Sequence, residues 1–81
     1  MKPLEIKGAR TRLGYSQRYM SERLGIHYEN YRKKERGVVK FTEDEKFAMG
    51  EILELSLEQL NDFLFDGKIP LGMRKDSSGM K

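Results

Sequence analysis

The fold of this chain is decided by the stretch SQRYMSERLGIHYENYRKKERG, residues 16–37. Met20 and Leu24 lie four residues apart and Tyr31 follows, so one stripe of each of two short helices can face inward. Gly25 lies between them, where a sharp turn needs the positive φ that glycine adopts without steric cost. The stretch therefore predicts a helix, a tight turn and a second helix that ends at the last glycine.

Two short helices joined by a few residues that include a glycine form a helix-turn-helix unit, whose second helix fits the major groove of DNA. Most residues of this stretch outside the inward stripe are basic or can form hydrogen bonds. The second helix is expected to begin at or just after His27. Two interpretations of His27 remain open: it contacts a phosphate at the helix start, or it is a partly exposed cap or turn residue.

Length and composition narrow the class of protein. The 81 residues predict one small domain, whose core is too modest for an enclosed active site. The absence of cysteine excludes disulfides and thiolate metal sites, and one histidine cannot build a metal cluster. The acids cluster at expected helix starts, and no nucleophile, base and orienting group stand at a recognisable spacing. We therefore expect no enzyme activity, no cofactor and no metal.

The start of the chain and its hydropathy bear on location. The first residues carry Lys2, Pro3, Glu5 and Lys7 rather than an apolar run, and no segment approaches a membrane-spanning length. The lack of cysteine also fits a reducing compartment. We expect a soluble, cytoplasmic protein.

The net charge of +3 conceals a division of charge along the chain. Residues 1–41 hold eleven Lys or Arg and four acids, a balance of +7, whereas residues 42–66 hold one Lys and eight acids, a balance of −7. Such a division indicates a basic face for a polyanion and an acidic face kept away from it. The alternative is ordinary solvated surface charge.

Three more helices are expected around the helix-turn-helix unit. The first begins near Pro3, whose missing N–H suits a first helical turn, and Gly14 closes it. Ser16 is the expected N-cap of the second helix. Capping boxes at residues 42–45 and 56–59 open the fourth and fifth helices.

The fourth helix is expected to run to about Leu53, with Gly50 marking the close approach of a neighbouring helix, and the fifth to stop at Gly67. Helical spacing gives the residues expected to face inward from these three helices: Ile6, Ala9, Arg10, Leu13, Phe47, Met49, Ile52, Leu53, Leu60, Phe63 and Leu64. Residues 1–67 are thus predicted to form the domain. Residues 68–81 offer little to bury, which predicts a partly disordered C-terminal tail.

Five short helices with this unit as the second and third resemble the Cro and phage-repressor (XRE-type) family of helix-turn-helix domains. The positions that carry the likeness agree in spacing and residue type: Gln17, Met20-Ser21 where the family has Leu-Ala, Leu24-Gly25-Ile26, the inward residue at 31, Glu35, Gly37 and Leu53 to Leu60. The resemblance implies an all-α, compact five-helix lambda-repressor-like DNA-binding domain, with the helix-turn-helix formed by helices 2 and 3.

The resemblance also implies a structural ion pair. The family pairs an arginine of helix 1 with a glutamate at the end of helix 3, and Arg10 and Glu35 occupy those positions. Three residues depart from the family. Tyr31 replaces an Ile, so its hydroxyl must find a partner or reach the surface. Lys34 replaces an apolar residue, and its amine is expected to emerge, while Glu54 replaces the Gly that ends helix 4.

The opposite stripe of the third helix then points outward, into the major groove. The residues predicted to read bases are Tyr28, Glu29, Asn30, Arg32 and Lys33. Arg32 and Lys33 can donate to guanine O6 and N7, and Glu29 can accept from cytosine N4. The Tyr28 ring can meet a thymine methyl or a phosphate, and Asn30 can read adenine or hold a phosphate.

A second set of residues is predicted to contact the DNA backbone: Gln17, Arg18, His27, Arg36 and Lys40. Gln17 resembles the phosphate contact of the family at the start of helix 2, where the helix N-terminus favours an anion. The cations of this set belong to the basic face, and their alternative role is solubilising charge.

These expectations describe a sequence-specific, double-stranded-DNA-binding transcriptional regulator. It would be a repressor or Cro-like protein of a phage, prophage or mobile element, acting by promoter occlusion and associated with the bacterial nucleoid when bound. The alternative is an antirepressor or antitoxin-type protein-interaction module, whose acidic helices 4 and 5 bind a protein partner.

One such unit reads only a few base pairs, so members of the family usually bind as two-fold dimers on palindromic half-sites. A homodimer is therefore expected here. The apolar surface nominated for it is helix 5 with Phe63, Phe65, Ile69 and Leu71, whose alternative role is domain core.

Overall fold

The computed structural model describes residues 1–69. Within them it forms a compact all-α globule of five helices and no strand, which confirms the predicted all-α class. The helices are α1 (Pro3–Arg12), α2 (Gln17–Leu24), α3 (Tyr28–Glu35), α4 (Glu43–Ile52) and α5 (Leu57–Leu64). The predicted tail, residues 68–81, lies outside the described residues from position 70 onward.

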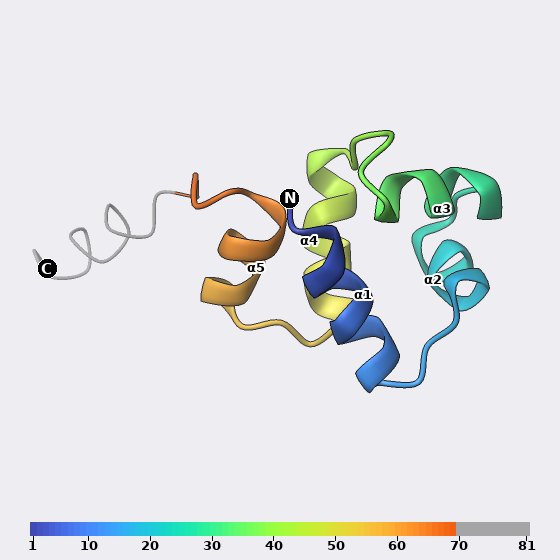
Figure 1. The fold of residues 1–81 in the computed structure, drawn as a ribbon, viewed down its shortest axis with the longest axis horizontal. Coiled ribbons are helices and arrows are strands. Elements are labelled where there is room, and N and C mark those ends of the chain that lie inside the picture. The colour runs from blue at the N-terminus through green and yellow to red at the C-terminus, as the bar shows by residue number, and fades with distance from the viewer. Residues whose placement is uncertain (70–81) are drawn as a thin grey trace, which may run out of the picture.

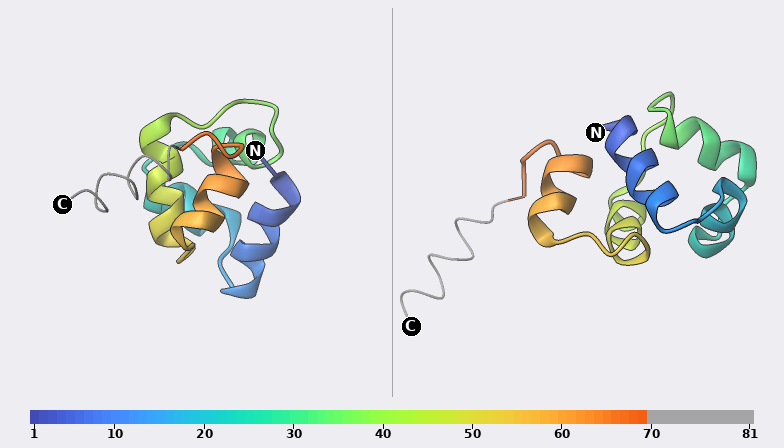
Figure 2. Two further views of the ribbon diagram at one scale, coloured as in Figure 1. Left: turned by 90° about the vertical axis from the view of Figure 1, so that its left-hand side faces the viewer. Right: turned by 60° about the horizontal axis from the view of Figure 1, so that its bottom comes forward.

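The helices pack with α2 and α3 together at one end of the molecule and α5 at the other (Figure 1). The two further views agree on this separation (Figure 2). The start of the chain is joined to α5, because the backbone N–H of Lys2 donates to the carbonyl of Phe63 at 2.8 Å and its amine pairs with Asp62 at 2.9 Å. The start of the chain thus lies between α5 and the turn after α3, where Met1 and Pro3 are close to Gly37.

Side-chain caps fix the starts of α2, α3, α4 and α5, whereas α1 begins at Pro3 without one. The Ser16 hydroxyl accepts from the backbone N–H of Tyr19 at 2.9 Å, and both capping boxes are formed, at residues 42–45 and 56–59. His27 is the N-cap of α3: its Nδ1 accepts from the backbone N–H of Glu29 at 3.2 Å. The cap interpretation of His27 is therefore confirmed.

Two helices end earlier than predicted. α3 ends at Glu35 rather than at Gly37, and α5 at Leu64 rather than at Gly67. Both glycines lie in the closing turns beyond the last helical residue, with φ of +86° and +76°. In the turn after α5, Asp66 also has a positive φ of +54°, so two left-handed residues in succession stop the helix.

The core gathers side chains from all five helices and from the loop before α4. Its buried apolar members are Ile6, Ala9, Met20, Tyr31, Phe41, Met49, Ile52, Leu53, Leu60 and Leu64. Two residues expected to face inward do not: Phe47 is 49% exposed and Leu13 is 36% exposed. Phe47 lies at the rim and packs its ring against Phe65, at 4.9 Å between centroids. Leu13 follows the last residue of α1, so helical spacing no longer directs it inward.

Gly50 marks a close helix contact, as predicted. A Cβ at this position would lie 2.9 Å from Cδ1 of Leu60, which is closer than such atoms normally come. The absence of a side chain at Gly50 therefore lets α4 and α5 pack closely at this point. The expectation that the Lys34 amine emerges was wrong. Its Nζ pairs with Glu45 at 2.6 Å, and both side chains are largely buried, which ties α3 to the first turn of α4.

The turn after α4 carries backbone strain. Glu54 stands where the family has glycine, and it adopts a φ of +58°, a conformation that costs a side-chain-bearing residue about 1–2 kcal/mol. Glycine has no such cost, although it loses more backbone entropy on folding.

We expect Glu54→Gly to raise the melting temperature by about 3 °C, because relief of the positive φ exceeds the added entropy. The matched control is Glu51→Gly, an exposed glutamate within α4, which should lower it by about 5 °C since glycine weakens a helix interior. Thermal melts followed by circular dichroism make the comparison. Equal losses for the two variants would contradict the strained turn.

Candidate nucleic-acid interface

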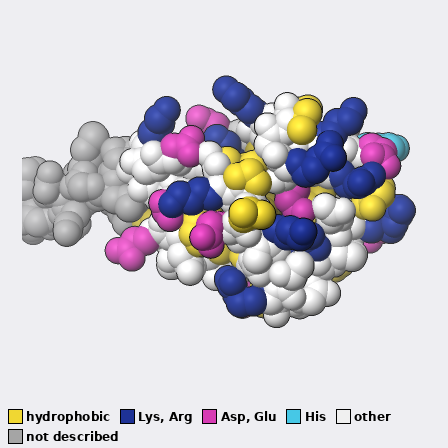
Figure 3. All heavy atoms as spheres, viewed as in Figure 1, with side chains coloured by type: hydrophobic (Ala, Val, Ile, Leu, Met, Phe, Trp, Pro, Cys, Tyr) yellow, Lys and Arg dark blue, Asp and Glu magenta, His cyan; other side chains and the backbone are white. Residues whose placement is uncertain are grey.

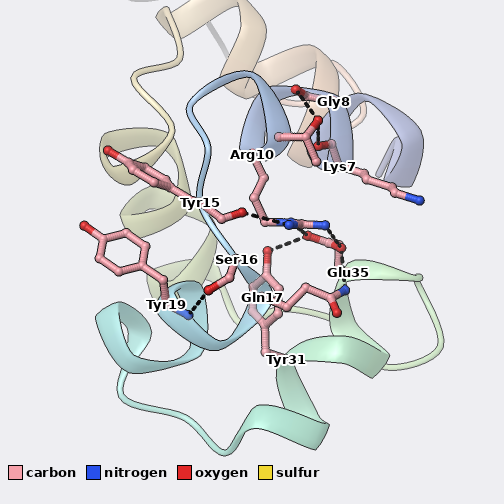
Figure 4. A network of polar contacts seen from close by, with 10 residues as sticks. Lys7, Gly8, Arg10, Tyr15, Ser16, Gln17, Tyr19, Tyr31 and Glu35 are labelled. Atoms are coloured by element: carbon pink, nitrogen blue, oxygen red, sulfur yellow. Dashed lines mark hydrogen bonds and ion pairs between the residues drawn. The ribbon is translucent and has the colours of Figure 1, made fainter.

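The carboxylate of Glu35, at the end of α3, joins three parts of the fold (Figure 4). It accepts from Arg10 of α1 twice, from Nε at 2.7 Å and from Nη2 at 3.2 Å. The Tyr31 hydroxyl, one turn earlier on α3, donates to it at 2.7 Å, and the Gln17 amide at the start of α2 donates at 2.8 Å. The predicted ion pair of Arg10 with Glu35 is therefore formed, and so is the partner required by the Tyr31 hydroxyl.

Arg10 uses its remaining side for the loop between α1 and α2. Its Nη1 donates to the backbone carbonyl of Tyr15 at 2.8 Å. The planar guanidinium thus joins a carboxylate on one edge and a carbonyl on another, which only an arginine can do at this position. With Arg10 8% exposed and Glu35 4% exposed, the pair lies inside the domain.

The surroundings keep this carboxylate charged. Burial raises the pKa of Glu35, but the hydrogen bonds from Arg10, Tyr31 and Gln17 outweigh it and hold the pKa below its ordinary value. Burial, together with the donation to Glu35, raises the pKa of Tyr31 well above its ordinary value. The Glu35 carboxylate therefore stays ionised, with three donor side chains, over the whole neutral range.

The network sets which side of α3 faces solvent. Because Tyr31 and Glu35 point into the domain, the opposite stripe is left outside: Glu29, Asn30 and Lys33 are exposed, and Tyr28 and Arg32 are half-buried. All five residues predicted to read bases thus belong to the outer part of α3. None of them lies in the core.

Contacts within this stripe explain the two half-buried members. The guanidinium of Arg18 lies over the Tyr28 ring, with Cζ 4.3 Å from the ring centroid. The guanidinium of Arg32 approaches the same ring less closely, at 5.7 Å, which is near the limit for a cation–π contact. Arg32 also pairs with Glu29 at 3.3 Å. No local pattern in the sequence indicates the contact between Arg18 and Tyr28, because the two residues are ten positions apart on either side of a turn.

The residues predicted to contact the DNA backbone divide into two groups. Arg18, His27, Arg36 and Lys40 are exposed, at the starts of α2 and α3 and beyond the end of α3. Gln17 is half-buried, and its amide nitrogen already donates to Glu35. The backbone N–H groups at the start of α2, rather than this side chain, would therefore face an anion there.

Charge is distributed unevenly over the molecule. On the face drawn in Figure 3, Lys and Arg side chains gather over the end where α3 lies, whereas acidic and basic side chains alternate over the end where α5 lies. Among the described residues, no group of three or more His, Cys, Asp or Glu side chains is arranged to hold a metal ion. None of the five described helices has the length and apolar character needed to cross a bilayer.

Arg10→Met should lower the free energy of unfolding by about 3–5 kcal/mol, because it leaves the buried Glu35 carboxylate without its cation. Arg12→Met is the matched control: it makes the same change at an exposed position in the last turn of α1. Urea denaturation of both variants gives the two values. A loss for Arg10→Met no larger than that of Arg12→Met would remove the structural role assigned to the pair.

The domain should lose stability in acid. Burial raises the pKa of Glu45, but the hydrogen bond from Lys34 and the cap to Thr42 outweigh it, so the folded-state pKa lies below 4.5, as it does for Glu35. Their contribution is complete above pH 4.5, and it is lost as the pH falls through the folded-state pKa because the unfolded chain binds protons first.

Glu45→Gln tests this dependence, since glutamine also closes a capping box but does not titrate. Urea denaturation between pH 7 and pH 3 should give a shallower acid loss for Glu45→Gln than for the wild type. Glu43→Gln, an exposed change in the same turn, should leave the slope unchanged. Parallel slopes for the wild type and Glu45→Gln would disprove the linkage.

Comparisons with known proteins give no family assignment for this chain: no family model, no curated protein and no solved structure matches it. The likeness to the Cro and phage-repressor family therefore rests on the residues and contacts described above.

Proposed function

We propose that this protein is a sequence-specific, double-stranded-DNA-binding transcriptional regulator that inserts α3 into the major groove. The observation that carries the proposal is the orientation of α3. Its polar outer stripe is open to solvent at the end of the molecule where Lys and Arg side chains gather (Figure 3), and four hydrogen bonds to Glu35 fix the inner side. A helix held in this way presents its side chains in a fixed array, as base recognition requires.

The chemistry of the exposed stripe suits base edges. Lys33 and Arg32 carry donors for guanine O6 and N7, Glu29 carries an acceptor for cytosine N4, and Asn30 matches the donor and acceptor pair of adenine. This mixture of donors, acceptors and one acid differs from a purely cationic surface, which would bind phosphates without regard to sequence.

Exposed polar and basic side chains beside this stripe supply the positioning contacts. His27 lies at the start of α3, and Arg36 and Lys40 follow α3, so they flank the reading helix. Occupancy of a promoter by such a domain blocks transcription without a cofactor. We therefore assign the protein to small repressors or Cro-like regulators of the phage, prophage or mobile-element type.

The regulator is proposed to act as a homodimer on palindromic half-sites, because one such helix reads few base pairs. Phe63, Phe65 and Ile69 are half-buried and pack against the core, and Leu71 lies outside the described residues. The exposed apolar surface on this side of the domain is instead formed by Phe47 and Leu57. Sedimentation equilibrium with and without operator DNA tests the dimer, and a monomer under both conditions would refute it.

A second candidate function is a protein-interaction module on the acidic helices, of the antirepressor or antitoxin type. It is favoured by a shallow groove of about 470 Å³ between α4 and α5. Phe47 and Leu57 line this groove, and Glu51 and Glu54 lie beside them. Such a module predicts no enrichment of any sequence when the protein is mixed with random DNA duplexes.

Selection of bound sequences from random duplexes at two salt concentrations tests the proposed function. The variants Lys33→Ala and Lys40→Ala then distinguish a base contact from a phosphate contact. Lys33 lies on the exposed stripe of α3, so its loss should change the base preference at one position. Lys40 lies in the loop beyond α3, so its loss should weaken binding to every sequence about equally and reduce the salt slope by about 1.

The two variants remove the same charge and serve as controls for each other. An equal loss on every sequence for Lys33→Ala would refute its reading role. No enrichment by the wild-type protein at either salt concentration would refute the proposed function itself.

A further inference from the structure

The contact between Arg18 and Tyr28 joins the two helices of the helix-turn-helix unit on their outer side. Arg18 is the second residue of α2 and Tyr28 the first residue of α3. The guanidinium lies over the ring, with Cζ 4.3 Å from the centroid, well inside the range of cation–π contacts. A side chain that belongs to α2 is thereby held at the first turn of α3.

The geometry of this contact leaves the hydrogen-bonding edges of Arg18 free. A guanidinium that stacks on a ring uses its flat face, whereas its N–H donors point outward in its own plane. Among the described residues no hydrogen bond or ion pair engages the Arg18 side chain, and the residue is exposed. Its donors are thus unoccupied, and the ring fixes where the guanidinium lies.

Arg32 is held differently, although it approaches the same ring. Its Cζ lies 5.7 Å from the Tyr28 centroid, and its Nη1 donates to Glu29 at 3.3 Å. One of its edges is therefore occupied within the protein. Of the two guanidinium groups beside the ring, that of Arg18 lies closer to it, and only that of Arg32 donates to another side chain.

We propose that Tyr28 is a positioning residue whose ring holds Arg18 against the first turn of α3, and that Arg18 reads a guanine as part of the α3 face. This inference rests on the proposed function. Helix-turn-helix units place the N-terminal residues of the second helix against base edges, which is where the Arg18 donors are held. Two parallel N–H groups match guanine O6 and N7. Tyr28 itself contacts no base in this arrangement.

The first test uses the free protein and needs no DNA. Aromatic ring current should shift the side-chain NMR resonances of Arg18 in the wild type. Tyr28→Leu should abolish that shift, and Tyr28→Phe should keep it, because the ring remains. Arg23, whose guanidinium lies 5.6 Å from the Tyr19 ring, serves as the internal control and should be unchanged in both variants. An Arg18 shift that survives Tyr28→Leu would overturn the positioning role.

The second test is a double-mutant cycle on the duplex selected by the wild type. Arg18→Ala should cost about tenfold in affinity and remove the preference for guanine at one position. Tyr28→Leu should cost about threefold in the wild-type background and nothing further once Arg18 is absent, since the ring acts through Arg18. Tyr28→Phe should bind like the wild type.

Two results of the cycle would overturn the proposal. An equal cost of Tyr28→Leu with and without Arg18 would make Tyr28 an independent contact, and a uniform loss on all sequences for Arg18→Ala would make Arg18 a phosphate contact. If the wild type selects no sequence at all, the proposed function and the guanine contact both fail. The NMR measurement in the free protein then still decides whether Tyr28 positions Arg18.

Discussion

The structure depends on one buried carboxylate. Glu35 accepts four hydrogen bonds from three side chains, and each of these side chains belongs to a different helix: Arg10 to α1, Gln17 to α2 and Tyr31 to α3. A charge inside a protein is costly unless it is fully paired, so this group tolerates few arrangements of its neighbours. In the described part of the chain no buried side-chain nitrogen or oxygen lacks a partner. The carboxylate thereby selects one orientation of α3 rather than adding much net stability.

Local signals in the sequence predicted most of the fold. Ser16, Gly25 and the two capping boxes act within a few residues of themselves, so their roles do not depend on the rest of the chain. Gly50 was predictable for a similar reason, because a glycine inside a helix needs a packing explanation. Phe47 was not, since helical spacing gives a direction but does not tell whether another element covers that direction.

The candidate site also has features that the sequence predicts and features that it does not. The outward stripe of α3 followed from two inward residues and helical geometry, and the Arg10–Glu35 pair followed from the family resemblance. The contacts of Arg18 with Tyr28 and of Lys34 with Glu45 each cross a turn or a loop, and their partners are separated by ten and eleven residues. Such contacts depend on how two helices meet, which no local pattern encodes.

The ion pair of Lys34 with Glu45 brackets the loop between α3 and α4. Phe41 is buried near the end of this loop, whereas Val38 and Val39 are exposed at its tip. The backbone N–H groups of Val38 and Val39 donate to the carbonyl of Lys33, at 2.9 and 3.3 Å, so this part of the loop also closes the end of α3. The entropy of closing a loop grows slowly, by about 0.6 kcal/mol for each doubling of its length. Residues inserted after Val39 would therefore lengthen this segment beyond the turn that closes α3, at a free-energy cost that grows slowly with their number.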